Sequence, residues 1–417
     1  MAHNPAVPST AFQAFVPAWL RREALTIAAV LMLVAVTVGG VAFFRDASRT
    51  DNPALFGNDY LAFYSAGRLA LEGRPEAAYD RAAHIAIQQK IVAEAKGGGR
   101  LAATYYFGYP PTYLTLVTPF ALLPYFPSLF LFLGLTATLY VAAMWLIWPG
   151  WRTILFAVAV PNAAIAFGFG QNGFLTAGLV GIALVLLDRR PVLSGILIGC
   201  LAFKPQLGLA FPVILAGTMR WRAFAAAAAA AAAIAAATLV WPGADTWHAF
   251  LDLAGMSRNQ LLETSGVGFD LIQSVFATLR GNGVAIDAAY ATQATFALAV
   301  AAILVGLWRS GADYRLKAAA AAVATLLMTP FCLPYDLLIE VPAAALFLAY
   351  GAERGFRPGE LALIAAALLT PQVAALGLAG PLPVGLAGMI VMFGVIVLRA
   401  RTDMRGYRGE VPAHAGP

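Results

Sequence analysis

Polar side chains in four short segments interrupt an otherwise apolar sequence. The segments are Asn58-Asp59-Tyr60, Gly170-Gln171-Asn172-Gly173, Phe203-Lys204-Pro205-Gln206 and the stretch from Thr329 to Asp336. A polar or charged group inside a membrane, or at the end of a membrane helix, costs several kcal/mol unless it has a partner or a function. These four segments are therefore the first candidates for a functional site.

The residue types in these segments suit chemistry on a phosphate-linked sugar. Asp59 supplies a carboxylate that can accept a proton, and Lys204 supplies a cation that can bind a phosphate. Lys204 lies where a proline interrupts two apolar segments. We favour a role for Lys204 in anion binding over the alternative, in which its side chain only extends to the membrane–water interface. Amide, phenol and acid groups can bind the hydroxyls of the substrates, and these candidates are Asn58, Tyr60, Tyr109, Gln171, Asn172, Gln206, Tyr335 and Asp336.

Each segment also has an ordinary structural explanation. Asp59 could be a solvated acid or part of a helix cap, and the Asn172 segment could be only a turn. Asp336 could cap a rigid turn between two prolines. Each motif is weak alone, and the hypothesis of a site depends on all four lying on the same side of a membrane.

The composition indicates a membrane protein. Of 417 residues, 61% are hydrophobic and 12% are charged, about half the charged fraction of a soluble domain. A crossing needs about 20 apolar residues, and such stretches recur along the chain. We predict an all-α polytopic protein, a single transmembrane domain over residues 1–417, with about twelve spans at roughly 24 to 44, 126 to 147, 153 to 168, 172 to 187, 191 to 203, 206 to 219, 223 to 241, 287 to 308, 316 to 330, 337 to 350, 360 to 379 and 383 to 400.

The basic residues predict an orientation rather than a nucleic-acid partner. The net charge is +6, but Lys and Arg are scattered singly or in pairs between apolar segments. Alternating sides at each span sends most of these residues to the cytoplasm when both termini are cytoplasmic. All four polar segments then lie on the extracytoplasmic side.

The longest hydrophilic segment, residues 45–108, becomes an extracytoplasmic loop in this topology. Residues 58 to 72 and 80 to 95 have helical spacing of apolar residues, so we predict amphipathic helices on the membrane surface, with Asn58 or Asp80 as a cap. Residues 109–124 are too short to cross and are flanked by prolines. We expect a re-entrant or interfacial segment there.

Five short motifs in this order resemble a known enzyme family. They are the acidic residue early in the first large loop, Tyr-Pro-Pro from Tyr109 with an apolar segment ending in Leu-Leu-Pro, the Gly-Gln turn, Lys-Pro-Gln from Lys204, and Thr-Pro followed by Tyr335-Asp336-Leu337. Over about residues 55 to 350 the chain resembles the polytopic bacterial glycosyltransferases of family 87, within the GT-C superfamily.

The resemblance implies a GT-C-like enzyme that moves a hexose, typically mannose, from a polyprenyl-phosphate carrier to a lipid-linked or other glycan acceptor, with inversion. It implies an active site outside the bacterial cytoplasmic (inner) membrane, with Asp59 as the general base and Lys204 balancing the departing phosphate. Gln171, Tyr335 and Asp336 would bind substrate. The family often carries a histidine before the Tyr-Asp pair, where this chain has Phe331 to Pro334, so its proton relay or acceptor would differ.

No cofactor or metal is expected, because the four histidines lack helical pairing and the two cysteines lie far apart in apolar sequence. We expect a monomer that binds the membrane, the lipid-linked sugar and the acceptor, and no nucleic acid.

The main alternative is a secondary transporter or a lipid or sugar flippase, which also has many spans and broken helices. A transporter predicts polar groups on both sides, whereas the cytoplasmic loops here are short and basic. A non-catalytic scaffold would leave Lys204 unexplained.

Overall fold

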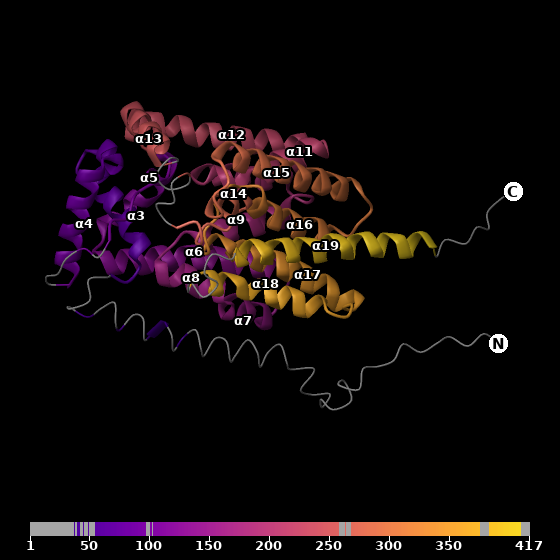
Figure 1. The fold of residues 1–417 in the computed structure, drawn as a ribbon. Helices are drawn as coiled ribbons and strands as arrows, with labels where there is room; N and C mark the ends of the chain where they lie inside the picture. Colours follow the sequence, from indigo (N-terminus) through magenta and orange to yellow (C-terminus); the bar gives the residue numbers. More distant parts are fainter. Residues whose placement is uncertain are drawn as a thin grey trace, which may run out of the picture.

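The computed structural model describes residues 55–96, 103–257, 268–375 and 383–409, together with positions 37, 40, 41, 45, 49, 101 and 263. Every regular element in these ranges is a helix, which confirms the all-α prediction. Figure 1 shows long helices running side by side, with α3 (Asn58–Leu71) and α4 (Arg81–Lys96) at one end of the bundle. The predicted first span at 24 to 44 lies almost entirely outside the described residues.

Four helices in the described ranges are long and apolar enough to cross a membrane. They are α6 (Tyr125–Ile147), the run Trp221–Met256, which is kinked at Trp241, α15 (Ile286–Arg309) and the Val384–Met404 part of α19 (Val384–Gly409). The pair α7 (Trp151–Ala159) and α8 (Pro161–Phe169), bent by 59°, gives a fifth if it counts as one broken span. These helices fit a multi-pass membrane protein, and the expectation of about twelve spans stays a prediction.

Several predicted spans coincide with helices that are too short to cross alone. The 14 residues of α9 (Gly173–Leu186) rise about 21 Å, against a hydrocarbon core of about 30 Å. Further examples are α16 (Tyr314–Leu327), α17 (Glu340–Arg354) and α18 (Glu360–Ala375). Most residues of α16 and α17 are buried by other helices. Their apolar sequence therefore reflects the protein core as much as lipid contact.

The half-length helices around Lys204 pack closely on the alanine-rich helix. The chain runs through α10 (Pro191–Gly199), η3 (Cys200–Phe203), η4 (Pro205–Gly208) and α11 (Ala210–Gly217). A Cβ atom at Gly195 or Gly199 would come within 2.4 Å or 2.6 Å of a backbone carbonyl oxygen of α12 (Trp221–Thr238). The alanine run thus provides the close helix packing that its small side chains predict.

Helix α3 is placed differently from the prediction. It forms where expected, but ten of its fourteen residues are buried, and it packs against α5 (Pro111–Val117) and η2 (Thr118–Leu122). An amphipathic helix at a membrane surface would bury one face only. The cap also differs: Gly57, with φ of 75°, precedes α3 and Asn58 does not cap it, whereas Asp80 Oδ1 accepts the Ala83 N–H at 2.7 Å at the start of α4.

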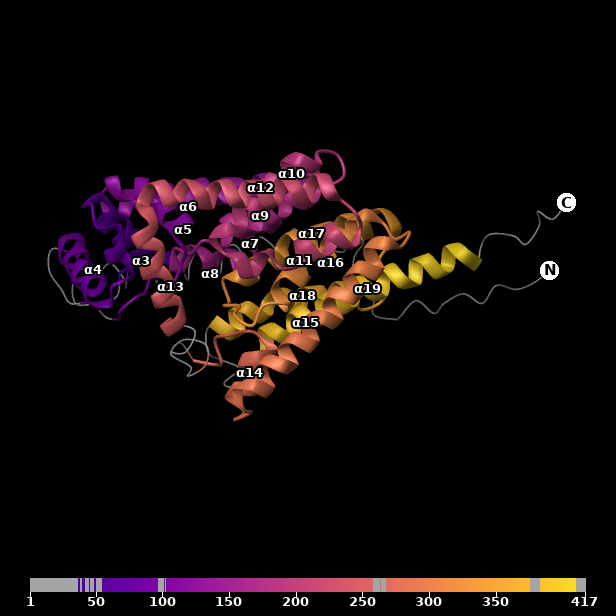
Figure 2. The ribbon, with the colours of Figure 1, turned by 90° about the horizontal axis from the view of Figure 1, so that it is seen from above.

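The remaining elements connect this bundle. They are η1 (Pro75–Tyr79), η5 (Leu239–Gly243), α13 (Ala244–Ser257), α14 (Val275–Gly281) and η7 (Asp336–Ile339). Figure 2 shows α12 reaching the end of the bundle that carries α3 and α4, where α13 turns sharply away from it.

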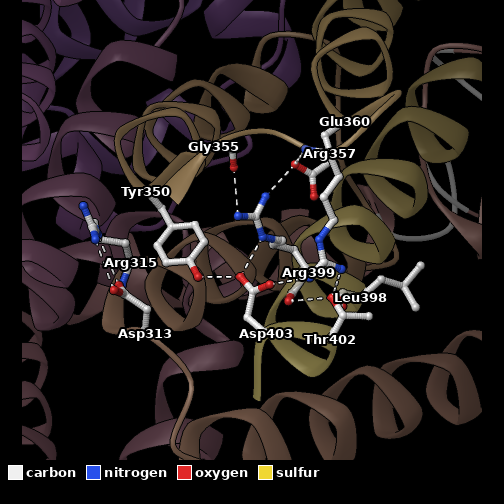
Figure 3. Close-up of polar contacts among 10 residues, drawn as sticks. All are labelled: Asp313, Arg315, Tyr350, Gly355, Arg357, Glu360, Leu398, Arg399, Thr402 and Asp403. Carbon is white, nitrogen blue, oxygen red and sulfur yellow. Dashed lines mark hydrogen bonds and ion pairs between the residues drawn. The ribbon is translucent and has the colours of Figure 1, made fainter. Parts of the chain in front are cut away.

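A charged cluster holds together the opposite end of the bundle (Figure 3). The nearly buried Arg399 guanidinium donates to Glu360 at 2.7 Å, Asp403 at 2.6 Å and the Gly355 carbonyl at 2.9 Å. Tyr350 donates to Asp403 at 2.5 Å, and its ring lies under the Arg399 guanidinium. These contacts tie the ends of α17, α18 and α19 to one another.

Candidate active site

The Gly170 to Gly173 turn between α8 and α9 brings two distant segments together. Gly170 has φ of +67°, and a Cβ atom there would lie 2.7 Å from the Tyr60 Cβ. A Cβ atom at Gly173 would lie 2.6 Å from the Tyr335 carbonyl oxygen. Only glycine allows both approaches. The turn therefore positions the start of α3 on one side and the Tyr335-Asp336 loop on the other.

Gln171 connects this turn to the predicted base. Its Nε2 donates to Asp59 Oδ2 at 2.8 Å, and its Oε1 accepts from the Tyr109 hydroxyl at 3.4 Å and from the Asn172 N–H at 3.1 Å. Gln171 is buried and Asp59 is half-buried. The amide, fixed through its oxygen, holds one carboxylate oxygen of Asp59, and the other oxygen has no hydrogen-bond partner among the described residues and can accept a proton from a substrate.

The surroundings of Asp59 make it a stronger base than an ordinary aspartate. Burial raises the pKa of its carboxyl group from 3.8 to about 6, and the Gln171 hydrogen bond and the Lys204 charge oppose this effect only in part. A carboxylate with this pKa is still mostly ionised at neutral pH. It can accept a proton in a transition state more effectively than a carboxylate of normal pKa.

Lys204, predicted to bind an anion, is paired with a carboxylate inside the protein. Its Nζ lies 2.5 Å from Asp336 Oδ1 and 3.2 Å from Asn172 Oδ1, and the side chains of the ion pair are 4% and 1% exposed. Asp336 Oδ2 also accepts the Leu333 N–H at 3.1 Å. An unpaired charge at this depth would be too costly, which is why a lysine and an aspartate 132 residues apart are paired. Described residues accept two of the three ammonium hydrogens, and the third can be donated to a ligand.

Aromatic rings surround this ion pair. The Lys204 ammonium lies 5.7 Å from the Tyr109 ring centre and 5.0 Å from the Tyr335 ring centre. Tyr113 continues the wall, with its ring 4.6 Å from Tyr109 and 5.2 Å from Phe203. The ring faces add attraction for the cation and an apolar surface on which a sugar or a lipid can lie.

Three polar atoms around the site are buried without a hydrogen-bond partner among the described residues: Asn58 Oδ1, Asn172 Nδ2 and the Tyr113 hydroxyl. Such atoms are rare in folded proteins and are expected to meet a ligand or water. Tyr113 was not among the predicted site residues, although it lies only four residues after Tyr109.

Glu340 was also missed. Its side chain is completely buried, one turn after Asp336, and both carboxylate oxygens lack a partner in the described part of the chain. Asn162 Nδ2 donates to the nearby Leu337 carbonyl at 2.9 Å. An acid inside a predicted span is the signal that could have identified Glu340.

Two predicted substrate-binding residues do not join the cluster. The Tyr60 hydroxyl shares a hydrogen bond of 2.6 Å with Ser128, and its ring packs 5.2 Å from Phe132 in the protein core. Gln206 is half-buried in η4 and forms no side-chain hydrogen bond with the described residues. Tyr60 points into the core because α3 is enclosed by protein rather than lying on a membrane surface.

The other predicted site residues do come together. Asp59, Tyr109, Gln171, Asn172, Lys204, Tyr335 and Asp336 form one cluster through the contacts above, and Asn58 precedes Asp59 at the start of α3. Within the described ranges, no group of three or more His, Cys, Asp and Glu side chains is placed to hold a metal ion. The absence of a metal requirement stays a prediction.

The family model of glycosyltransferase family 87 matches residues 106–331, more than half of the chain. The matched part includes Gln171 and Lys204. Asp59 and Asp336 lie outside it and are joined to it by the hydrogen bond to Gln171 and the ion pair with Lys204. No curated protein and no solved structure matches the chain. The chain belongs to glycosyltransferase family 87.

Proposed function

We propose that this glycosyltransferase is a GT-C-type enzyme that transfers a hexose, mannose in the first instance, from a polyprenyl-phosphate donor to a lipid-linked or other glycan acceptor. Asp59 is the general base and the reaction inverts the anomeric carbon. The contact between Asp59 and Gln171 carries this proposal, because it joins a base with a raised pKa to the part of the chain that matches the family.

The transfer is a single displacement. The free Asp59 oxygen takes the proton of an acceptor hydroxyl as that oxygen attacks the anomeric carbon. The new carbon–oxygen bond forms as the bond from the anomeric carbon to the phosphate oxygen breaks, and polyprenyl phosphate leaves with the electron pair. Asp59 then releases its proton to solvent. The other carboxylate of the cluster, Asp336, is engaged by Lys204 and Leu333, which supports one attacking base rather than a second nucleophile.

Lys204 stabilises the leaving phosphate through its third ammonium hydrogen. The ion pair with Asp336 neutralises the charge of Lys204, so a phosphate would have to share Lys204 with Asp336. Asn172 is placed to take part, since its Nδ2 is buried without a partner among the described residues while its Oδ1 holds Lys204. An oriented cation and amide suit a phosphate, which already leaves well, and need no metal.

The charged ends of the helices support an orientation in the bacterial cytoplasmic (inner) membrane. The cluster of Figure 3 lies at the end of the bundle opposite α3 and α4. Its three arginines, Arg315, Arg357 and Arg399, follow the positive-inside preference. We place this end and both termini in the cytoplasm and the site on the extracytoplasmic side.

The donor is identified by incubating purified protein with a panel of polyprenyl-phosphate sugars and measuring released polyprenyl phosphate. We expect one hexose donor to release polyprenyl phosphate, and the release to reach its full rate only when the acceptor is present. A flippase would move the lipid across a vesicle membrane without releasing polyprenyl phosphate. No release from any donor would overturn the proposed reaction.

A further inference from the structure

A groove opens on the side of the bundle between two helices that can span the membrane, α15 and α19. Its volume is about 410 Å³, and its lining includes Ile303, Gly306 and Leu307 from α15, Ser310 directly after it, and Val397 and Arg401 from α19. The intervening helix α16 packs against both, and the two helices run alongside it in Figures 1 and 2. None of the lining residues belongs to the Asp59 cluster, so the groove is a separate site.

The wall of the groove is apolar over most of its length. Ile303 is 36% exposed, and a Cβ atom at Gly306 would meet no atom within 4 Å, so the missing side chain adds to the open space. Leu298 and Leu398 on the same two helices are 71% and 61% exposed. Exposed side chains of this kind are typical of a helix surface that faces lipid, and a hydrocarbon chain is the medium that fills such a groove.

One end of the groove carries an arginine, Arg401. Arg401 is exposed and forms no ion pair or side-chain hydrogen bond with any described residue. Its neighbour Arg399 is held by two carboxylates, as Figure 3 shows. Lys317 lies behind the groove wall, where its Nζ donates to the carbonyl oxygen of Ser310 at 2.7 Å. A guanidinium at the end of a membrane-spanning helix lies at the level of the lipid phosphates. Its two parallel N–H groups can donate to two oxygens of one phosphate.

We propose that this groove binds an anionic phospholipid of the surrounding bilayer, with its phosphate on Arg401 and one acyl chain along Gly306. The apolar wall alone would accept any lipid. Arg401, which has no ion-pair partner among the described residues, selects a lipid with net negative charge over a zwitterionic one. The site is a lipid site of the membrane domain and does not depend on the identity of the sugar donor.

Native mass spectrometry of the purified full-length protein tests this proposal, with phosphatidylglycerol and phosphatidylcholine titrated separately. Wild-type protein should bind phosphatidylglycerol more tightly. Arg401→Gln should weaken that binding about five-fold, or about 1 kcal/mol, toward the phosphatidylcholine value. Gly306→Leu should weaken the binding of both lipids by filling the groove. Arg354→Gln, an exposed arginine at the end of α17 outside the groove, is the matched control and should bind like wild type.

Equal binding of both lipids by wild-type protein would overturn the proposal. So would unchanged phosphatidylglycerol binding by Arg401→Gln. A concentration-dependent dimer that Gly306→Leu abolishes would assign the groove to a second copy of the chain and would also refute a lipid site.

Discussion

Removing one partner of the Lys204–Asp336 ion pair should be far more damaging than removing both. The two side chains are 4% and 1% exposed and lie 2.5 Å apart, so Lys204→Met leaves a buried carboxylate with no cation, and Asp336→Asn leaves a buried ammonium with no anion. Breaking a buried pair in this way costs about 3–5 kcal/mol. We expect each single variant to lose stability of that order.

The double variant Lys204→Met with Asp336→Asn should recover most of this loss. It buries no charge, and the asparagine oxygen can still accept the Leu333 N–H that Asp336 Oδ2 accepts at 3.1 Å. The coupling energy between the two positions should therefore be about 3 kcal/mol or more. Thermal unfolding in detergent, followed by tryptophan fluorescence, measures all three variants beside wild type.

Two results would refute this reasoning. Single variants that unfold like wild type would show that the ion pair carries no such energy. A double variant as unstable as the two losses added together would show that the positions are independent. The same double variant separates stability from chemistry, since it should be folded but poor in transfer. Wild-type transfer by it would remove Lys204 from the proposed mechanism.

Three further substitutions test the placement of the site. The transfer rate should fall as the pH drops through about 6, because Asp59 must be deprotonated to act. Gln171→Leu removes the hydrogen bond that opposes the effect of burial on the Asp59 pKa, so it should move the inflection of the rate-against-pH curve to higher pH. An inflection near pH 4 in wild-type protein would contradict this. Tyr60→Phe should cost about 1 kcal/mol in a melting experiment through the lost Ser128 contact and should keep transfer, so a loss of transfer would return Tyr60 to the site. Gly173→Ala should destabilise the protein by about 1–3 kcal/mol, because its Cβ would lie 2.6 Å from a carbonyl oxygen, and normal stability would rule out that close approach.

The polar segments were predictable because they contrast with their apolar surroundings. Asp59, Gln171, Lys204 and Asp336 each stand out in the sequence, and the structure joins them into one cluster. The pairing of Lys204 with Asp336 could not be predicted, since a sequence read segment by segment gives no distance between residues 132 positions apart. The cation was therefore assigned to the substrate before its protein partner was known.

The burial of the helices was the harder part of the fold to predict. An apolar run looks the same whether lipid or protein covers it, so α16 was predicted as a span although its alanines are buried in the bundle. The same ambiguity affected α3, whose apolar residues were predicted to face a membrane and instead pack against α5 and η2. Tyr113 was missed because a tyrosine in a short proline-flanked segment gives no sign that its hydroxyl is buried without a partner among the described residues.

The central claim is that Asp59 is the base of a sugar transfer, and the Asp59→Asn variant tests it most directly. The variant should remain folded and be no less stable than wild type at neutral pH. The pKa of the Asp59 carboxyl group in the folded protein, about 6, lies above its ordinary value of 3.8. Ionisation of Asp59 therefore destabilises the fold as the pH rises from about 4 to 6, by at most about 3 kcal/mol. Asparagine does not ionise and removes this loss of stability. Asp252→Asn, at an exposed aspartate of α13, is the matched control.

The decisive measurement is the rate at which purified Asp59→Asn protein releases polyprenyl phosphate from the donor that wild type uses. We predict a fall of about 10²–10⁴-fold, with donor binding retained and with wild-type rates for Asp252→Asn. Transfer by Asp59→Asn at the wild-type rate would contradict the account.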